Sequence, residues 1–382
     1  MSFALAQLDF KPGQPKNNYF LIKTELLCYG LKVGEKEKEA LRKQNPFGEK
    51  RAGFSAGGFF ILENGFNLNA PIYEEFVQYS PYSLKLEDSD WKLYKDNEYI
   101  CKCNPVPPPN WYWKNLKDGT PAARIVQRHG NRMLATAVWS DCSLFAKGEE
   151  CKFCLIGLNK QAMPYKRIDQ LKEALLIALT EEPQYEIVLN SGSTYTPDRG
   201  ALIFVDYVKA IREVSSIPIS IELMPPADLK SLDALAEAGV NSVGMNLEVF
   251  DEKMRKIICP GKTKLAPTEQ YLAAWKYSLE LFGEGSVSSV LLAGLESKES
   301  TVRGVEFMID NGVIPEILVY RPMDVTPIKY FPRPRPEDIL YIHEKLYEKL
   351  AESSIKPAGK PGCLRCGGCS LTINMYKGAQ IE

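Results

Sequence analysis

From residue 133 onward, short apolar runs alternate with amphipathic stretches along the chain. Apolar runs of strand length occur at 133–140, 185–193, 217–224, 241–250, 286–296 and 314–322. Between them, apolar residues recur every three or four positions, as in DQLKEALLIALTEE (169–182), which is the spacing of a helix that buries one face. Regular strand–helix alternation with short loops predicts a parallel sheet covered by helices. Six strands are too few for an eight-stranded barrel, so we predict an α/β fold with a partial (βα)6 TIM-like barrel.

The pattern changes on either side of this core, which we place at 131–330. Residues 1–130 contain stretches that alternate apolar and polar residues between turn signals, which predicts a β-rich N-terminal extension. Within it, the proline-rich stretch NPVPPPNWYW (104–113) predicts a loop. Residues 331–382 are predicted to form a final helix at 336–353, followed by a cysteine-rich loop.

Composition narrows the functional classes. The chain has 382 residues and a formal net charge of -1, so nothing in its charge favours nucleic acid or a membrane surface as a partner. It contains no long apolar run that would predict a membrane-spanning helix, and its first residues lack the pattern of a signal peptide. We therefore expect a cytoplasmic protein. In a reducing compartment, clustered cysteines indicate metal or redox chemistry rather than disulfides.

Three of the ten cysteines lie in CSLFAKGEECKFC (142–154), directly after the first predicted strand of the core. Their spacing is Cys-x8-Cys-x2-Cys, formed by Cys142, Cys151 and Cys154. Three thiolates on one loop can hold three irons of a 4Fe–4S cluster and leave the fourth iron open to a further ligand. The alternative is a zinc site completed by a remote residue, but His129 and His343 are the only histidines available to it.

A second group of three cysteines lies near the C-terminus in CLRCGGC (363–369), with three glycines in and beside it. Its members are Cys363, Cys366 and Cys369. Three interpretations remain open for this group: a second 4Fe–4S cluster, a structural zinc site, or free thiols. The sequence does not determine a fourth ligand; the candidates are Cys28, Cys101, Cys103, Ser370 and the substrate itself.

The order of strand, cysteine loop and partial barrel resembles the radical S-adenosylmethionine (SAM) superfamily. The commonest spacing in that superfamily is Cys-x3-Cys-x2-Cys, so the first gap is longer here, while Phe153 before the last cysteine fits its pattern. The resemblance implies a 4Fe–4S cluster on Cys142, Cys151 and Cys154 that binds SAM at its open iron. One electron from a ferredoxin or flavodoxin would cleave SAM to methionine and a 5′-deoxyadenosyl radical, which abstracts hydrogen from an unactivated carbon.

Three further motifs at predicted strand ends extend this resemblance. NSGS (190–193) takes the place of the motif that meets the SAM amino group, with two serines in place of its acid. MNLEVF (245–250) is similar to the ribose-contacting stretch of biotin synthase and lipoyl synthase. VLLAGLE (290–296) resembles the segment that supports the adenine, without its first glycine and with leucine where isoleucine is usual. The SAM contacts implied in this way are Ser191, Ser193, Asn246, Glu248 and Leu292.

Narrower similarities concern the subgroup. FSAGGFFI, CPGKT (259–263), GVIPEILVYRP and CLRCGGCSLT resemble biotin-synthase-related proteins, among them the archaeal two-protein lipoyl synthase. This resemblance implies sulfur insertion from the second cluster into a small-molecule or carrier-bound acyl substrate, and it admits a second radical SAM subunit as a partner. TYTPDRGA and the long cysteine gap instead resemble a sister group encoded beside nitrilase-like genes.

Two alternatives to sulfur insertion follow. The sister group points to radical modification of a small nitrogen-containing metabolite, with the second cluster as a substrate anchor or electron relay. A zinc-stabilised binding protein or an electron carrier is the alternative outside radical chemistry, and it would not cleave SAM. Four cationic residues near predicted strand ends are candidates for a substrate carboxylate, or else surface residues: Arg199, Lys262, Arg303 and Arg321.

Overall fold

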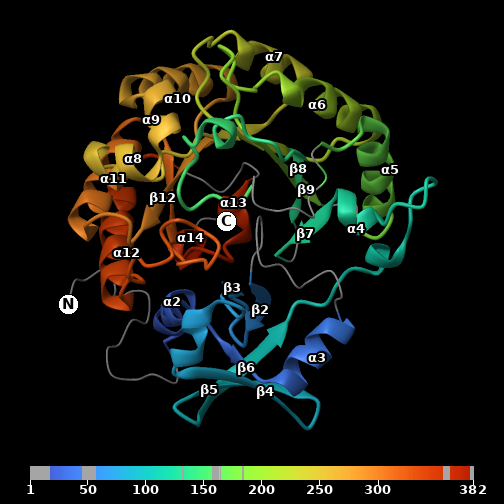
Figure 1. The fold of residues 1–382 in the computed structure, drawn as a ribbon, viewed down its shortest axis with the longest axis vertical. Helices are drawn as coiled ribbons and strands as arrows, with labels where there is room; N and C mark the ends of the chain where they lie inside the picture. Colours follow the sequence, from blue (N-terminus) through green and yellow to red (C-terminus); the bar gives the residue numbers. More distant parts are fainter. Residues whose placement is uncertain are drawn as a thin grey trace.

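The computed structural model of the chain describes residues 18–44, 57–130, 133–156, 163, 165–182, 185–355 and 362–378. In these residues the chain forms two sheets, which lie in different parts of Figure 1. A seven-stranded sheet curls through the upper part, and a six-stranded sheet lies below it. The C-terminal helices α13 (Cys363–Cys366) and α14 (Thr372–Gly378) lie between the two.

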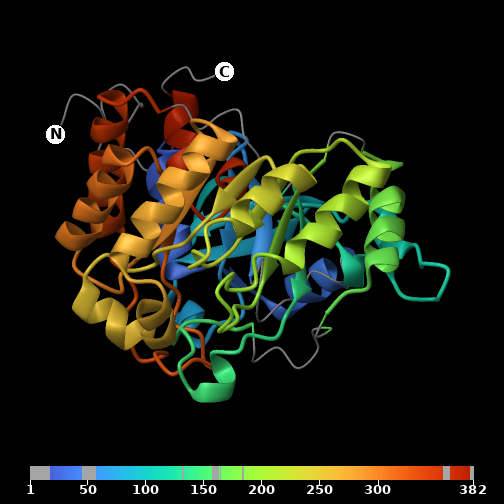
Figure 2. The same ribbon diagram turned by 90° about the horizontal axis from the view of Figure 1, so that it is seen from above.

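The seven-stranded sheet is the predicted partial barrel. Its strand order is β13-β12-β11-β10-β9-β8-β7, and every pair from β8 to β13 is parallel. Figure 2 shows helices along the outside of this sheet. The six parallel strands are β8 (Met133–Trp139), β9 (Glu186–Ser191), β10 (Ile219–Glu222), β11 (Ser242–Gly244), β12 (Val287–Ala293) and β13 (Ile314–Val319). The α/β fold with a half-barrel sheet is therefore confirmed.

The outer helices follow the strands in the predicted order. In α6 the residues Phe204, Tyr207, Val208 and Ile211 are buried, which places the apolar stripe of the helix against the sheet. The outer helices are α5 (Ile168–Leu179), α6 (Ile203–Val214), α7 (Ser231–Ala238), α10 (Thr268–Phe282), α11 (Lys298–Asp310) and α12 (Pro336–Ala351).

Several elements differ from the prediction. Strand β7 (Gln127–His129) pairs antiparallel with β8, so the barrel sheet begins before residue 131. Two short helices, α8 (Glu252–Ile258) and α9 (Pro260–Leu265), follow β11, and one short helix, α4 (Ala122–Ile125), precedes β7. They have four to seven residues, which is too short for a helical apolar period to stand out in the sequence.

The N-terminal extension contains the predicted strands and also helices. Its sheet has the order β1-β4-β5-β6-β2-β3, and residues 1–17 and 45–56 lie outside the described part of it. The proline-rich stretch begins at the end of β6 and continues into a short 3-10 helix, η3 (Asn110–Trp113). The elements are α2 (Tyr19–Tyr29), β1 (Lys32–Val33), α3 (Glu35–Gln44), β2 (Gly58–Leu62), β3 (Asn67–Ala70), η2 (Glu75–Tyr79), β4 (Tyr82–Glu87), β5 (Asp90–Lys95) and β6 (Glu98–Pro105).

Alternate residues of the barrel strands face its interior, where α13 lies. Glu186 of β9 forms an ion pair with Arg365 of α13, with 2.7 Å between Oε2 and Nη1. Two residues further along β9, Val188 packs with Met133 of β8 and Cys366 of α13. Because Met133 and Glu186 begin their strands, α13 occupies the amino-terminal end of the barrel interior.

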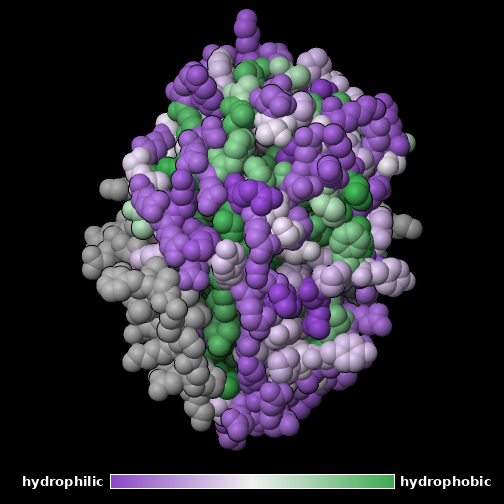
Figure 3. All heavy atoms as spheres, turned by 90° about the vertical axis from the view of Figure 1, so that its left-hand side faces the viewer, coloured by the Kyte–Doolittle hydropathy of each residue, from purple (hydrophilic) through white to green (hydrophobic). Residues whose placement is uncertain are grey.

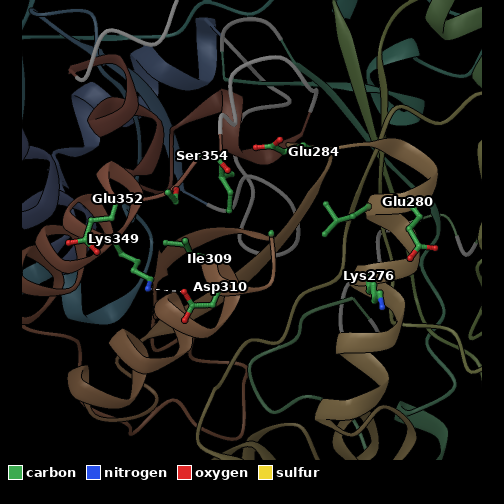
Figure 4. A pocket seen from close by; sticks show the side chains of 12 residues that line it. Lys276, Glu280, Glu284, Ile309, Asp310, Lys349, Glu352 and Ser354 are labelled. Atoms are coloured by element: carbon green, nitrogen blue, oxygen red, sulfur yellow. Dashed lines mark ion pairs between the residues drawn. The ribbon is translucent and has the colours of Figure 1, made fainter.

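The outer surface carries a pocket that lies away from the predicted site residues. Polar side chains cover most of the face shown in Figure 3, with hydrophobic side chains dispersed among them. A pocket of about 790 Å³ lies between the ends of α10, α11 and α12, where Lys349 pairs with Asp310 at 2.7 Å (Figure 4). None of the predicted site residues lines it. Among the described helices, none has the length and apolar character needed to cross a membrane.

Candidate functional site

The cysteine loop follows β8 at the carboxyl end of the barrel and is joined to the turn after β9. Ser143 donates its backbone N–H to the carbonyl oxygen of Ser193 at 2.9 Å, and Ser193 donates its own N–H to Sγ of Cys142 at 3.4 Å. Between these residues Gly192 fits closely against the loop, since a Cβ atom there would be 2.1 Å from the carbonyl oxygen of Asp141. The NSGS turn therefore positions the first cysteine through its backbone.

The helices α8 and α9 cover the other end of the cysteine loop. Lys152 donates its backbone N–H to Ile258 O at 2.7 Å, and Gly261 donates its N–H to Glu149 O at 3.0 Å. Cys259, between the two helices, is buried and hydrogen-bonds to the Cys151 thiol. This hydrogen bond is the main cause of a lowered pKa for Cys151. Cys259 was not among the predicted site residues, because an isolated cysteine in a sequence usually indicates only a small buried side chain.

The three predicted ligands lie close enough to affect one another electrostatically. Burial raises the pKa of Cys154 to about 12, with a further contribution from Cys151 and a smaller one from Cys142. Burial also raises the pKa of Cys142, against the opposing effect of backbone N–H groups of Ser193 and Leu144. Two of these thiols therefore resist ionisation in the protein alone, and positively charged iron would supply the compensation they lack.

A 4Fe–4S cluster and a single metal ion need different arrangements of their ligands. Within the described part of the chain, no three His, Cys, Asp or Glu side chains converge closely enough to enclose one metal ion. A cubane cluster binds each cysteine at a separate iron corner, so its ligands stand further apart than those of one zinc ion. Three mutually interacting thiols on one loop can hold three irons of such a cluster.

The predicted SAM contacts lie around this loop, at the ends of β9, β11 and β12. The amide of Asn246 donates to Glu222 Oε2 at 2.8 Å and accepts from Val290 N at 3.1 Å. Leu292 packs against the same buried hydrophobic cluster as Cys151 and Phe153. The Ser191 hydroxyl donates to the carbonyl oxygen of Gly192 at 2.9 Å. Their roles toward SAM stay predictions.

Glu248, the remaining predicted contact, forms an ion pair with Lys262 of α9. Burial alone would lower the pKa of Lys262, but the Glu248 carboxylate, with smaller effects of Tyr271, Cys151 and Cys259, raises it well above its usual value. Lys262 therefore stays charged next to the cysteine loop. This contact shows that Lys262, considered above for a substrate carboxylate, already has a carboxylate partner in the protein.

The other three cationic candidates are also placed by the structure. Arg199 donates to the carbonyl oxygens of Tyr195 and Thr196 at 2.8 and 3.0 Å. Arg321 donates to Asn69 Oδ1 of the N-terminal extension at 2.8 Å. Arg303 is exposed on the outer helix α11, so it lies on the surface and away from the barrel interior.

The second cysteine group lies at the opposite end of the barrel interior and is fixed by the N-terminal extension. The carbonyl oxygens of Cys366, Gly367 and Gly368 accept hydrogen bonds from Asn67 Nδ2, Lys23 Nζ and the Asn69 backbone N–H, respectively. With its carbonyls directed toward the extension, the loop directs the N–H of Gly368 to the Cys366 thiol. No pattern in the sequence predicts this contact, because the partners are separated by about 300 residues or more.

The electrostatics of this loop suit a bound cluster. Burial raises the pKa of all three thiols, to about 12 for Cys366. Arg321 and Lys23 oppose this effect at Cys369. Cationic side chains and an N–H group aimed at sulfur are features that stabilise thiolates and the sulfides of a cluster.

The candidates for a fourth ligand have other contacts. The Ser370 hydroxyl lies 2.9 Å from Thr372 Oγ1 and accepts from Thr372 N at 3.1 Å, at the start of α14. Cys28, Cys101 and Cys103 are buried in the main hydrophobic core, whereas Cys366 belongs to a separate cluster with Met133 and Val188.

The chain is similar to several known proteins. A curated relative, bacteriochlorophyllide c C-7(1)-hydroxylase of Chlorobaculum limnaeum, is 27% identical over 380 residues, covering 92% of this chain and 91% of the relative. Among solved structures, methylornithine synthase (PylB) is similar with a TM-score of 0.47 and 16% identity, covering 60% of this chain and 66% of that one. A radical SAM methyltransferase from Sphaerobacter thermophilus is similar with a TM-score of 0.45 and 14% identity, covering 70% and 75%.

The family described as the Radical SAM superfamily matches residues 142–307. The match begins at the first cysteine of the loop and ends within α11, so it includes β9 to β12 and every predicted SAM contact. Neither the biotin-synthase-related subgroup nor the nitrilase-associated one is confirmed by these similarities. The cysteine loop and strands β9 to β12 are therefore similar in sequence to the radical SAM superfamily.

Proposed function

We propose that this enzyme removes a hydrogen atom from an unactivated carbon of a substrate held inside the barrel and replaces it with a hydroxyl group from water. The superfamily implies a 4Fe–4S cluster and SAM, which together supply a 5′-deoxyadenosyl radical as the hydrogen acceptor. The substrate radical becomes an alcohol when it gives one electron to an iron–sulfur or comparable acceptor and combines with water, which releases a proton.

The observation that carries the choice of hydroxylation is the extent of the similarity to the hydroxylase, which covers nine-tenths of both chains and therefore reaches beyond the barrel. The barrel interior is consistent with it. Ser220 of β10 lies against Gly362, and Ser288 of β12 is paired in register with Gly244 of β11, so hydroxyl groups line the wall where water would have to be held. The proposal carries over the class of reaction, not the chlorin substrate.

The proposed reaction also needs a second cluster and an external electron donor. Cys363, Cys366 and Cys369 would hold a second cluster, supported by the Gly368 N–H directed at Cys366 and by Arg321 and Lys23 near Cys369. Such a cluster, at the amino-terminal end of the interior, is suited to accept an electron from the substrate radical. A ferredoxin or flavodoxin would supply the electron for SAM cleavage.

Sulfur insertion is the second candidate, and the position of the C-terminal cysteines favours it. They close the barrel interior on the side opposite the SAM loop, so a sulfide held there would face a substrate radical formed between the two groups. In this case an acyl group on a carrier protein is the expected substrate, and a second radical SAM subunit a further partner. The product then contains sulfur instead of oxygen from water.

The experiment uses anaerobically reconstituted full-length protein, reduced with dithionite and supplied with SAM. We expect 5′-deoxyadenosine to form, and we expect the Cys142→Ala/Cys151→Ala/Cys154→Ala variant to form none, while Cys28→Ala, outside both groups, stays active. With two cubanes the wild type carries about eight irons per chain and the Cys363→Ala/Cys366→Ala/Cys369→Ala variant about half. Cleavage of SAM by the loop variant would contradict the radical mechanism.

Products are then identified in ¹⁸O-labelled water with three kinds of substrate: bacteriochlorophyllide c, organic ammonium compounds and octanoylated carrier protein. Hydroxylation gives a product whose mass rises by one ¹⁸O atom. Sulfur in the product would favour sulfur insertion over hydroxylation. Unlabelled oxygen in the product would exclude water as the source of the oxygen.

A further inference from the structure

Two carboxylic acid side chains face the interior of the barrel. Glu222 ends β10 and is paired in register with Gly244 of β11, where a Cβ atom would lie 2.5 Å from both of its carboxyl oxygens. The carboxyl group therefore lies across Gly244 on the inner wall. Glu316, in the middle of β13, points inward because its neighbours Ile317 and Val319 pack into the core with the outer helices. Only 4% of Glu316 is exposed.

These groups lack hydrogen-bond donors. Among the described residues, no hydrogen bond or ion pair reaches the carboxyl group of Glu316. Asn190 is paired in register with Glu222, and its Oδ1 atom is buried without a partner. Glu222 accepts a single described hydrogen bond, from Asn246 Nδ2 at 2.8 Å. Three acceptor groups on the inner wall therefore share one donor.

Such an arrangement is unfavourable in the protein alone. Burying a carboxyl group without a partner costs free energy, which the group reduces by staying protonated. Burial raises the pKa of Glu316 to about 8, with a further contribution from the charge of Glu222. Burial also raises the pKa of Glu222 to about 7, against the opposing effect of Asn246. A bound ligand that brought positive charge and N–H groups would satisfy these acceptors together.

The wall around the two carboxyl groups is built from small residues. Ser220 precedes Glu222 on the same face of β10, and Ser242 and Gly244 take the equivalent positions of β11. Ser288 of β12 continues this row. A metal ion is a poor candidate for the space, since within the described chain no three potential metal ligands of the His, Cys, Asp or Glu type converge.

We propose that the barrel interior binds an organic cation, as a primary ammonium or guanidinium group, between Glu222 and Glu316, with Asn190 Oδ1 as a third acceptor. The claim that this cation is part of the substrate rests on the proposed function. The claim that the cation binds does not depend on that function. Asn246, which contacts Glu222, is a predicted SAM ribose contact, so the cationic group lies next to the SAM site. The carbon that loses hydrogen then belongs to a nitrogen-containing compound anchored by its charge.

The test measures binding to reconstituted full-length protein with 1,4-diaminobutane as the probe and 1,4-butanediol as its uncharged counterpart. Saturation-transfer NMR, which detects weak ligands, is carried out at pH 8.5, where the amines stay charged and the carboxyl groups are ionised. We expect the diamine to bind and the diol to show at most one-tenth of its affinity, because only the diamine offers charge-assisted hydrogen bonds.

The variants Glu316→Gln and Glu222→Gln keep the shape of each side chain and remove its charge. Each should weaken diamine binding about tenfold or more, whereas Glu182→Gln, at an exposed position, should not. Thermal unfolding confirms that the variants fold. Equal binding of diamine and diol, or unchanged binding in both interior variants, would overturn the proposed cation site.

The formation of 5′-deoxyadenosine, measured on the same samples, separates the two proposals. If the protein cleaves SAM but does not bind the diamine, the proposed cation site is wrong and the proposed reaction still stands. If the protein binds the diamine but does not cleave SAM, the proposed cation site still stands and the proposed reaction is contradicted.

Discussion

Lys262 Nζ lies 3.0 Å from Glu248 Oε1, and the two side chains are only 13% and 12% exposed. Glu248 has a φ of 70°, in the left-handed region that residues other than glycine rarely adopt. Its backbone is held there by β12, because it donates to Val290 O and accepts from Leu292 N, both at 2.8 Å. The ion pair thus links the end of β11 to the α9 segment that covers the cysteine loop.

Removing one partner of this pair should be costly. Lys262→Met leaves the Glu248 carboxylate buried beside the cysteine loop, so we expect a loss of about 3–5 kcal/mol in unfolding free energy. Urea unfolding of the apoprotein measures it. The double variant Lys262→Met/Glu248→Gln should recover most of the loss, and Lys256→Met, from an exposed pair with Glu252, should cost about 0.5 kcal/mol or less. A double variant as unstable as the single one would show that burial of the charge is not the cause.

The close contact at Gly192 predicts a specific defect in cluster binding. In Gly192→Ala the new methyl group would collide with the carbonyl oxygen of Asp141, so the loop must move and Cys142 with it. We expect iron bound at the loop to fall severalfold in quantitative iron analysis. Gly119→Ala is the control, since its Cβ would meet open space although its φ of 84° disfavours alanine. Equal iron loss in both variants would indicate general destabilisation.

The predicted ribose contacts can be tested apart from the cluster. Glu248→Gln and Asn246→Ala should weaken SAM binding about tenfold, since a hydrogen bond to a charged group contributes about 1.5–3 kcal/mol. Isothermal titration with SAM measures the affinity, and iron content should equal that of the wild type. Unchanged affinity in both variants would place the ribose elsewhere along the strand ends.

Glu316 should make stability depend on pH. Because its folded pKa is raised to about 8, the folded protein holds a proton that the unfolded chain releases near its ordinary pKa of 4.5. The contribution of Glu316 is therefore fully present below about pH 4.5 and is lost as pH rises through 8. We expect the unfolding free energy of the apoprotein to fall over this range, and to fall less in Glu316→Gln. Parallel pH profiles for the two proteins would contradict this.

Because Lys23 contacts the C-terminal loop, substituting it should change the hydrogen exchange of that loop, which is distant in the sequence. Lys23→Met removes the donor to Gly367 O and to Asn374 Oδ1, so residues 362–378 should open more readily. Hydrogen exchange of this segment should accelerate about tenfold or more, because a buried hydrogen bond from a charged group is worth about 1.5–3 kcal/mol. Lys43→Met, whose side chain is 75% exposed, is the matched control.

The parallel core of the barrel was predictable because strands buried on both faces appear as short apolar runs, and the helices between them keep a clear period. The run at 286–296 corresponds to β12 and the run at 314–322 to β13. The cysteine loop was predictable for a different reason: its ligands are close together in the sequence. The motifs at the strand ends are equally local in the sequence, and their roles toward SAM stay predictions.

The rest depends on contacts between distant segments. Cys259 meets Cys151 only because two short helices fold back over the loop, and neither helix has enough residues to show a period. Glu222 and Glu316 appear in the sequence as single polar interruptions of apolar runs. Whether such a residue faces helices or the barrel interior depends on strand register and on how far the sheet curls, which one-dimensional patterns do not encode.

The attachment of the C-terminal loop to Lys23, Asn67 and Asn69 also bears on the order in which the protein is completed during translation. A ribosome makes the three attachment points early and the loop last, so at about 5–20 residues per second some 15 seconds or more separate them. The last barrel strand, β13, is itself made about 45 residues before the loop, and during that shorter interval the amino-terminal end of the barrel has no cover. The barrel can therefore fold, and the first cysteine group can be loaded, through an opening that residues 362–378 then close.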